Sequence, residues 1–353
     1  MYIDKFYNNL LIGDFTDQRL EPEHGRGILC SSLGNNTFAS GSSDHGIRVW
    51  NRNNLKYKYE LFSKFYGHKE WVTQVIHLSN DMIISGGMDG KICLWNNNEI
   101  KCKTIDAHDG SISCLIKDNK DLIASAGYDG IVKLWKSKEN NITTSQLSPK
   151  LKVPIICLKI KNSLVVSGNK NGEINLWDIN KDVSIYNKKI FEEGISNLIF
   201  GGINEYIIFS GGLKNGSLKG IDLRSHKIII NLNGKGGSLN YMHSLNDNQI
   251  IIAGTDKNIS IIDIRKYNEL FNNKKINNSI MSGNIYKDIL FIGTIDGNVF
   301  VFDINQNLNS LWGFGCIKSG SVNIINIDNI NEYIIISGDD NSSLVLNFKN
   351  KKK

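Results

Sequence analysis

Three stretches of the chain each contain a histidine, a serine and an aspartate at nearly equal spacing, and these residue types together can perform nucleophilic catalysis. A hydrolytic active site needs one such set, whereas this chain carries three, so the recurrence argues against a unique catalytic centre. We therefore expect the chain not to be an enzyme and assign no catalytic residue. The three sets are His24, Ser40 and Asp44; His68, Ser85 and Asp89; and His108, Ser125 and Asp129.

Other residues that could do chemistry lack the required spacing. The stretch Gly234-Lys235-Gly236-Gly237 departs from the G-x-x-x-x-G-K-[ST] pattern of a phosphate-binding loop, so we interpret it as a flexible loop. The six cysteines show no paired spacing, and no group of histidines and cysteines has the spacing of metal ligands. We expect no metal, no cofactor and no disulfide, with the thiols reduced in an intracellular compartment.

The stretch Ser85 to Trp95, S-G-G-M-D-G-K-I-C-L-W, indicates which elements carry these side chains. Ile83-Ile84 begins a β-strand, Met88-Asp89-Gly90 makes a tight turn, and Lys91 to Trp95 returns as a second strand. Neither face of the returning strand is consistently polar, which is typical of a sheet covered on both sides.

This hairpin recurs along the whole chain at intervals of about 40 to 45 residues, which is typical of four-stranded propeller blades. We therefore predict an all-β, closed β-propeller with eight blades, and a seven-bladed ring is the alternative. The near copies are Ser40 to Trp50, Ser125 to Trp135 and Ser167 to Trp177, and the weaker copies are Ser210 to Ile221, Ala253 to Ile262, Ile292 to Phe302 and Ser337 to Leu346.

The repeat resembles the WD-repeat family of β-propellers. The resemblance is carried by Trp50, Trp95, Trp135 and Trp177-Asp178, together with Gly67-His68 and Ala107-His108 upstream of two hairpins. It implies that the histidine, serine and aspartate of each set form a buried hydrogen-bond network with the tryptophan of the same repeat. The expected tryptophans are Trp50, Trp95 and Trp135.

The N-terminal segment is expected to complete the last blade. His24 stands four residues before Ile28, as His68 stands four before Val72, so the innermost strand of blade one follows His24. A strand within Leu10 to Leu20 would then be the outermost strand of blade eight, removing an exposed sheet edge. We predict an N-terminal segment of residues 1–23, a propeller of residues 24–348 and a basic tail of residues 349–353.

Bulk properties limit the class of protein. The chain has 353 residues and a net charge of +6, and it contains no run of 18 apolar residues. We expect a soluble intracellular protein, in the cytoplasm or the nucleus, without membrane insertion. The lysines at 349 and 351–353 favour a solvated tail over a contact with RNA or an acidic protein.

The resemblance also implies a partner-binding rim of loops, at the residue before the turn aspartate and at the residue that opens the innermost strand. Large apolar side chains at such exposed turns favour an interface. Lysine and arginine near the rim leave open a preference for acidic or phosphorylated peptides. The candidate rim residues are Ser43, Met88, Tyr128, Lys170 and Ile295 for the turns, and Trp71 and Ser111 for the strand starts.

A second surface is suggested by Ile221-Asp222-Leu223-Arg224 and Ile262-Asp263-Ile264-Arg265. These resemble the W-D-x-R ending of WD-repeat receptors that dock on a cullin ubiquitin-ligase adaptor, which makes Arg224 and Arg265 candidate docking residues. Both stretches have isoleucine in place of tryptophan, and ordinary strand ends are the competing interpretation.

We predict a non-enzymatic scaffold or adaptor, a monomeric ring that holds protein partners on its rim within a larger intracellular complex. A substrate receptor of a cullin-type ubiquitin ligase is one alternative. An RNA-associated factor is another, for which steep salt dependence of binding is expected.

Overall fold

The computed structural model describes residues 16–62, 65–95, 101–138, 141–146, 153–181, 183–266 and 270–347. These residues form eight four-stranded antiparallel sheets and a short 3₁₀ turn, η1 (Ile203–Glu205). The sheets divide between two compact units, residues 1–105 with 280–353 and residues 106–279. One sheet per repeat confirms the eight-bladed, all-β propeller, and the seven-bladed alternative is wrong.

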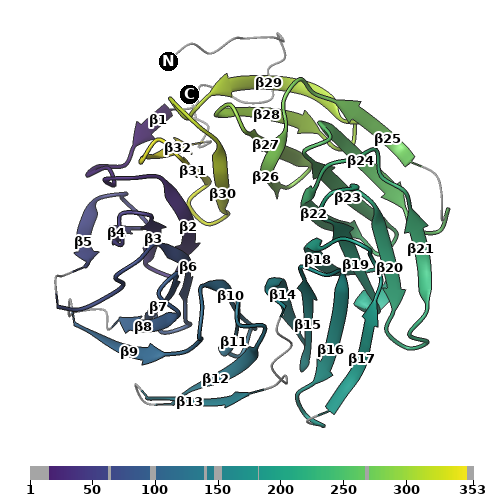
Figure 1. Cartoon of the computed structure of the whole chain (residues 1–353). Coiled ribbons are helices and arrows are strands. Elements are labelled where there is room, and N and C mark those ends of the chain that lie inside the picture. Colours follow the sequence, from purple (N-terminus) through teal and green to yellow (C-terminus); the bar gives the residue numbers. More distant parts are fainter. Residues whose placement is uncertain are drawn as a thin grey trace. The chain divides into compact units, whose positions relative to one another are not determined.

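The first unit contains blades one, two, seven and eight (Figure 1). Blade one is β2 (Ile28–Leu33), β3 (Thr37–Ser42), β4 (Ile47–Asn51) and β5 (Tyr57–Leu61), and blade two is β6 (Val72–His77), β7 (Ile83–Gly87), β8 (Lys91–Trp95) and β9 (Cys102–Asp106). Blade seven is β26 (Ile280–Tyr286), β27 (Ile289–Thr294), β28 (Asn298–Asp303) and β29 (Asn309–Gly315), and blade eight is β30 (Val322–Asp328), β31 (Tyr333–Gly338), β32 (Ser343–Asn347) and β1 (Thr16–Arg19).

The second unit contains blades three to six. Blade three is β10 (Ile112–Lys117), β11 (Leu122–Gly127), β12 (Val132–Lys138) and β13 (Asn141–Gln146), and blade four is β14 (Ile155–Lys161), β15 (Leu164–Asn169), β16 (Glu173–Asp178) and β17 (Val183–Lys189). Blade five is β18 (Ile195–Gly201), β19 (Ile207–Gly212), β20 (Leu218–Asp222) and β21 (Ile228–Leu232), and blade six is β22 (Leu239–Asn246), β23 (Gln249–Gly254), β24 (Asn258–Asp263) and β25 (Leu270–Lys275).

The hydrophobic core lies between successive blades within each unit. In β7 every residue is buried, and in β8 every residue after Lys91 is buried. A strand buried on both faces cannot alternate apolar and polar residues, which explains the near-continuous runs of isoleucine, leucine and valine. Blades one and two, for example, share a cluster that includes Val49, Val72 and Trp95.

The turn between the second and third strands is built on a left-handed residue. Gly90 has φ 73° and Gly130 has φ 76°, a conformation that glycine adopts without a steric penalty. The same turn position holds His45, Lys257 and Asn341 in blades one, six and eight, with φ values of 72°, 68° and 71°. These turns therefore keep the same geometry although their sequences differ.

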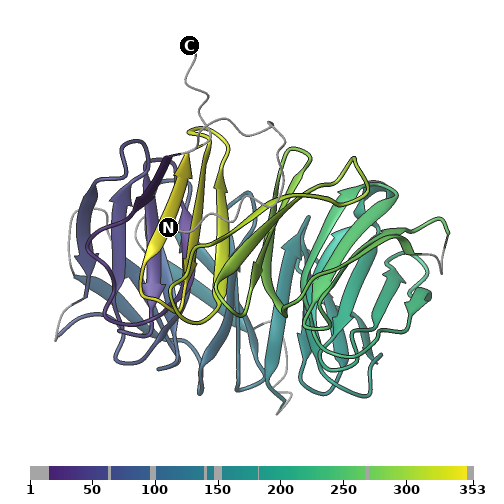
Figure 2. The ribbon, with the colours of Figure 1, turned by 90° about the horizontal axis from the view of Figure 1, so that it is seen from above.

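The N-terminal strand completes blade eight, as expected. β1 pairs antiparallel with β32, with Thr16 opposite Asn347 and Arg19 opposite Leu344. Figure 2 shows the dark purple β1 beside the yellow strands of that blade. The prediction of a closing strand within Leu10 to Leu20 is confirmed for residues 16–19. The basic tail at 349–353 lies outside the described residues.

The strand register corrects two repeat positions. Ser85 pairs with Cys93 across the hairpin of blade two, and the residue that pairs in the same way in blade six is Ile252, opposite Ser260. The assignment of Ala253 to the serine position is therefore wrong by one residue, and the turn of blade six has the regular length. In blade eight the same comparison moves the position from Ser337 to Ile336, opposite Leu344.

Candidate functional site

The three histidine, serine and aspartate sets form buried hydrogen-bond networks. In blade two, Trp95 Nε1 donates to Ser85 Oγ at 2.9 Å, Ser85 Oγ lies 2.8 Å from His68 Nε2, and His68 Nδ1 lies 3.0 Å from Asp89 Oδ1. An indole can only donate and a carboxylate can only accept, so the serine hydroxyl donates to His68 Nε2 and His68 Nδ1 donates to Asp89.

Blade three repeats this network with nearly the same distances. Trp135 Nε1 donates to Ser125 Oγ at 2.8 Å, and Ser125 Oγ lies 2.7 Å from His108 Nε2. His108 Nδ1 lies 3.0 Å from both carboxylate oxygens of Asp129. Because Ser85 and Ser125 are both fully buried, neither hydroxyl can reach a substrate.

Blade one departs from the expected network at its tryptophan. His24 Nδ1 lies 3.0 Å from Asp44 Oδ2 and His24 Nε2 lies 2.8 Å from Ser40 Oγ, but Trp50 Nε1 donates to the Glu21 carbonyl oxygen at 3.2 Å. The expectation that Trp50 bonds to Ser40 is therefore wrong. The segment that leads from β1 into blade one supplies this acceptor, and blade one is the blade that follows the closing strand.

The network aspartates are held in their charged form. Burial by itself raises the pKa of Asp129, but the hydrogen bonds from His108 and from the backbone N–H groups of Ile131 and Asp109 outweigh it and lower the pKa. The same balance lowers the pKa of Asp89 and of Asp44. Each aspartate thus joins the loop before the innermost strand to the turn between the second and third strands.

The predicted rim positions are bonded to each other through the backbone within each blade. Met88 N donates to Trp71 O and Tyr128 N donates to Ser111 O, both at 2.9 Å. Trp71, Met88 and Tyr128 are 41%, 43% and 56% exposed. The grouping of Trp71 and Met88 with Tyr128 into one surface stays a prediction, because Tyr128 belongs to the second unit.

The remaining rim candidates differ in accessibility. Ile295 is 53% exposed, Lys170 is exposed and Ser111 is half-buried. Ser43 is buried, and its hydroxyl donates to the Gly27 carbonyl oxygen at 3.3 Å. Ser43 was expected on the exposed rim and is instead buried, because its short side chain turns back onto its own blade.

The sequence interpretation missed three exposed aromatic residues next to Trp71. Phe62, Phe65 and Tyr66 lie in the loop that joins β5 to β6, and they are 41%, 87% and 41% exposed. We call Phe62, Phe65, Tyr66, Trp71 and Met88 the aromatic rim. Three aromatics within five residues, just before Gly67-His68, were the available signal.

Arg224 and Arg265 are exposed at corresponding strand ends of blades five and six. Arg224 Nη2 lies 2.8 Å from Asp222 Oδ2, and Arg265 Nη2 lies 2.6 Å from Asp263 Oδ2. Their side chains are 69% and 64% exposed. The Arg224 guanidinium also lies 5.3 Å from the ring centroid of the exposed Tyr206. Both arginines are accessible, although each is paired with the aspartate two residues before it.

The other features that the sequence raised are thiols, metal ligands, membrane-spanning segments and the terminal lysines. All six cysteines are free thiols. No group of three potential metal ligands occurs among the described residues. No helix within the described ranges is long and apolar enough to cross a membrane. The terminal lysines, on which the RNA alternative depends, are outside those ranges.

A family model described as WD domain, G-beta repeat matches residues 19–51, 59–96 and 100–136. No curated protein matches the sequence. Among solved structures, the computationally designed Ika8 protein is 20% identical with a TM-score of 0.79, covering 93% of this chain and 99% of that one. The Dos1 propeller is 17% identical with a TM-score of 0.79, covering 97% and 96%.

Sqt1 of Saccharomyces cerevisiae is 16% identical with a TM-score of 0.77, covering 94% of this chain and 97% of that one. At these identities the structural similarity shows the fold alone. The three matched segments coincide with the blades that carry a histidine, serine and aspartate set. The matched segments identify WD repeats in residues 19–136, and the shared fold shows that the chain is an eight-bladed β-propeller.

Proposed function

We propose that this chain is a non-enzymatic scaffold that holds a protein partner on the aromatic rim of blades one and two. Scaffolding of protein interactions is the general role of WD-repeat propellers. The observation that carries the proposal is the concentration of exposed apolar side chains between residues 62 and 88. Exposed aromatic residues and methionine are the side chains most enriched at interface centres.

The aromatic rim stands on a rigid base, which favours binding because little order must be gained when a partner docks. Lys69 N donates to Asp89 Oδ2 at 3.0 Å, and Met88 N donates to Trp71 O at 2.9 Å. A Cβ added to Gly67 would lie 2.9 Å from Trp95 Cη2, so the loop packs directly on the buried indole. The network of blade two thus supports the exposed aromatic residues from below.

Affinity purification with quantitative mass spectrometry tests the proposal. The Phe65→Ala, Trp71→Ala, Met88→Ala triple variant should lose one or more partners that the wild-type chain retains. The matched control is Ile330→Ala, which removes an apolar side chain that is 76% exposed elsewhere in the same unit. An identical partner set for the wild type and a folded triple variant would contradict docking on the aromatic rim.

A second candidate function rests on Arg224 and Arg265, whose exposure at matching strand ends supports docking of an acidic adaptor surface. The Arg224→Ala, Arg265→Ala double variant should then lose a cullin adaptor from the purified set. Lys227→Ala, an exposed cation near Arg224, is the control for charge alone. Absence of any cullin adaptor from the wild-type set would remove this candidate.

A further inference from the structure

Blade six lacks three of the four side chains that make the network in blades two and three. Lys235, four residues before Leu239, occupies the histidine position. Ile252 occupies the serine position, and Ile262, opposite Ile250 as Trp95 is opposite Ile83, occupies the tryptophan position. Only the aspartate, Asp256, is retained. No buried hydrogen-bond chain can form from these residues.

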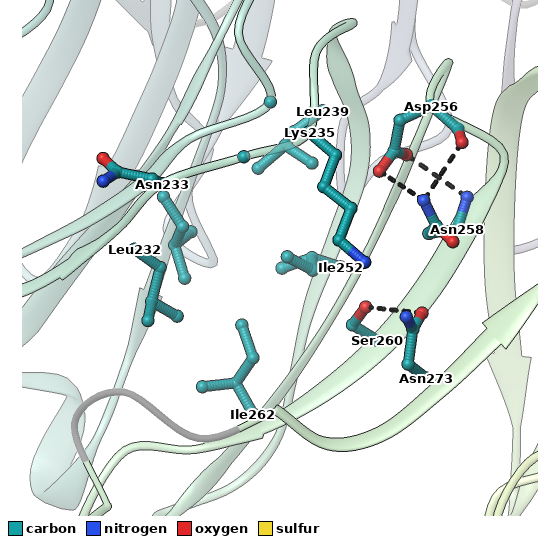
Figure 3. A pocket seen from close by; sticks show the side chains of 13 residues that line it. Leu232, Asn233, Lys235, Leu239, Ile252, Asp256, Asn258, Ser260, Ile262 and Asn273 are labelled. Carbon is teal, nitrogen blue, oxygen red and sulfur yellow. Dashed lines mark hydrogen bonds between the residues drawn. The ribbon is translucent and has the colours of Figure 1, made fainter.

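The replacements leave a cavity of about 60 Å³ between blades five and six (Figure 3). Its floor is aliphatic, and its mouth is formed by loop and turn residues of the rim side. In Figure 3 the Lys235 side chain extends from its loop into the space between the aliphatic and polar walls. The lining residues are Gly216, Leu218, Leu232, Asn233, Gly234, Lys235, Leu239, Ile252, Asp256, Asn258, Ser260, Ile262 and Asn273.

The cavity is lined by Ile262, which stands at the position of the buried Trp95 of blade two. There Trp95 Cη2 reaches the position beneath Gly67, the residue before the histidine. In blade six Gly234 stands at the corresponding sequence position and packs against the backbone of Asn215 and Gly216, and Ile262 is shorter than the indole of Trp95. Blade five also has isoleucine in the tryptophan position, but its corresponding residues, Ile190 and Phe191, are buried and fill the space.

The polar wall contains one cation without a partner. Asp256 Oδ2 accepts from Asn258 Nδ2 at 2.8 Å, and Ser260 Oγ bonds to Asn273 Oδ1 at 3.3 Å. Within the described residues, no hydrogen bond or ion pair engages the Lys235 ammonium group. Among the lining residues Lys235 is the single cation and Asp256, which accepts from Asn258, is the single anion.

We propose that this cavity is a second partner site, which takes one aliphatic side chain of an acidic peptide segment while Lys235 pairs with a carboxylate of that segment. The aliphatic floor fits the side chain, and the unpaired ammonium group fits the carboxylate. The site lies in the second unit and shares no residue with the aromatic rim, so each proposal can fail without the other.

The size of the cavity selects a peptide over a free metabolite. A cavity of about 60 Å³ holds on the order of four or five water molecules, which is enough for one branched side chain. Sites for free small molecules enclose most of the ligand, whereas here everything beyond that side chain must stay outside. A segment of a longer chain, lying across the rim loops, meets that requirement.

Methyl NMR on protein labelled at the isoleucine methyl groups tests the site. The probe is the peptide acetyl-Gly-Asp-Leu-Gly-amide, and saturable shifts are expected at Ile252 and Ile262. Two matched peptides, with asparagine for the aspartate or alanine for the leucine, should each bind about tenfold more weakly. Free 4-methylpentanoate, which carries the same branched group and a carboxylate, should bind more weakly than the Asp-Leu peptide.

Variants separate the two halves of the site. Lys235→Gln should weaken the Asp-Leu peptide about tenfold and leave the Asn-Leu peptide unchanged, and Lys257→Gln is the control for a neighbouring exposed lysine. Ile262→Trp should fill the cavity and abolish the shifts, provided that its melting curve shows a folded protein. Absence of shifts with every peptide, equal binding of the Asp-Leu and Asn-Leu peptides, or tighter binding of 4-methylpentanoate would each overturn the proposal.

Discussion

Blades three and six differ in the side chains at the tryptophan position and at the network positions around it. In blade three the position is sealed, because Trp135, Ser125, His108 and Asp129 satisfy one another in a continuous hydrogen-bond chain. In blade six the position is apolar and partly empty, with Ile262 where the indole would be. Both blades keep four strands and the same register across the turn, with Ala126 opposite Val132 and Ala253 opposite Ile259. The network is therefore one way to complete a blade, and the fold does not require it.

Blade four shows the cost of an intermediate arrangement. It keeps Ser167 and Trp177 at the network positions, yet Ser167 Oγ and the opposed Asn175 Nδ2 are buried without a hydrogen-bond partner among the described residues. A partly satisfied buried network is less stable than either a complete network or an apolar core. Blade six has isoleucine at both the serine and the tryptophan position, so neither position there carries a polar group that needs a partner.

The largest effect on stability is expected when the tryptophan of blade three is replaced by isoleucine, the residue at the same position of blade six. Trp135→Ile should lower the free energy of unfolding by about 3 to 4 kcal/mol, because it opens a cavity and removes the donor to Ser125. Chemical unfolding followed by tryptophan fluorescence and circular dichroism measures this. A loss below about 1 kcal/mol would show that the sealed network contributes little to stability.

The second-largest effect concerns Asp129 and Asp256, which occupy corresponding turn positions in blades three and six. Asp129→Ala should lower stability by about 2 to 3 kcal/mol, since His108 and two backbone N–H groups lose their acceptor. Asp256→Ala is the matched control and should cost less, because among the described residues the Asp256 carboxylate accepts only from Asn258. Equal losses in the two melting curves would contradict the different roles of the two blades.

The pH dependence of stability should also show the contribution of Asp129. The folded-state pKa of Asp129 lies below its ordinary value of about 3.9, so its contribution is full above that pH and is lost as the pH falls toward the folded-state pKa. We expect the melting temperature of the wild type to fall below about pH 4 and Asp129→Asn to fall less steeply. Parallel curves for the two proteins would show that Asp129 is not a source of acid sensitivity.

The smallest expected effect is a gain in blade six. Ile262→Trp should raise stability by about 1 kcal/mol, because the larger side chain would fill the cavity that Ile262 lines. The same differential unfolding measurement suffices, with Ile221→Trp in the filled position of blade five as the control, which should lose stability by overpacking. A loss of stability in both variants would mean that the blade-six cavity is not shaped for an indole.

The sequence was sufficient for the repeat, the number of blades and the closing strand, because these follow from side-chain periodicity and from the position of His24. It could not place Trp50, since the acceptor at Glu21 belongs to a crossing segment that no local pattern describes. Nor could the sequence alone align blade six with the other blades. That alignment follows from the strand register, in which Gly254 pairs with Leu239 and Ile250 pairs with Ile262, and residue identity does not reveal it.

The candidate sites were less predictable than the fold. Rim positions could be derived from the turn aspartate, but the burial of Ser43 and the exposure of Phe65 depend on how each loop folds over its own blade. The cavity of blade six is lined by Ile262, which is shorter than the tryptophan at that position in blades two and three, and a missing volume has no sequence motif of its own. Lys235 belongs to the stretch interpreted as a flexible loop, and the structure shows that it lines this cavity.

The most direct test follows both blades in one titration with acetyl-Gly-Asp-Leu-Gly-amide. Ile123 pairs with Trp135 in blade three, and Ile262 faces the cavity in blade six, so their methyl signals report on the sealed and the open position. We predict saturable shifts at Ile262 and none at Ile123. Unchanged signals at both, or equal shifts at both, would contradict the claim that blade six has turned a structural position into a binding site.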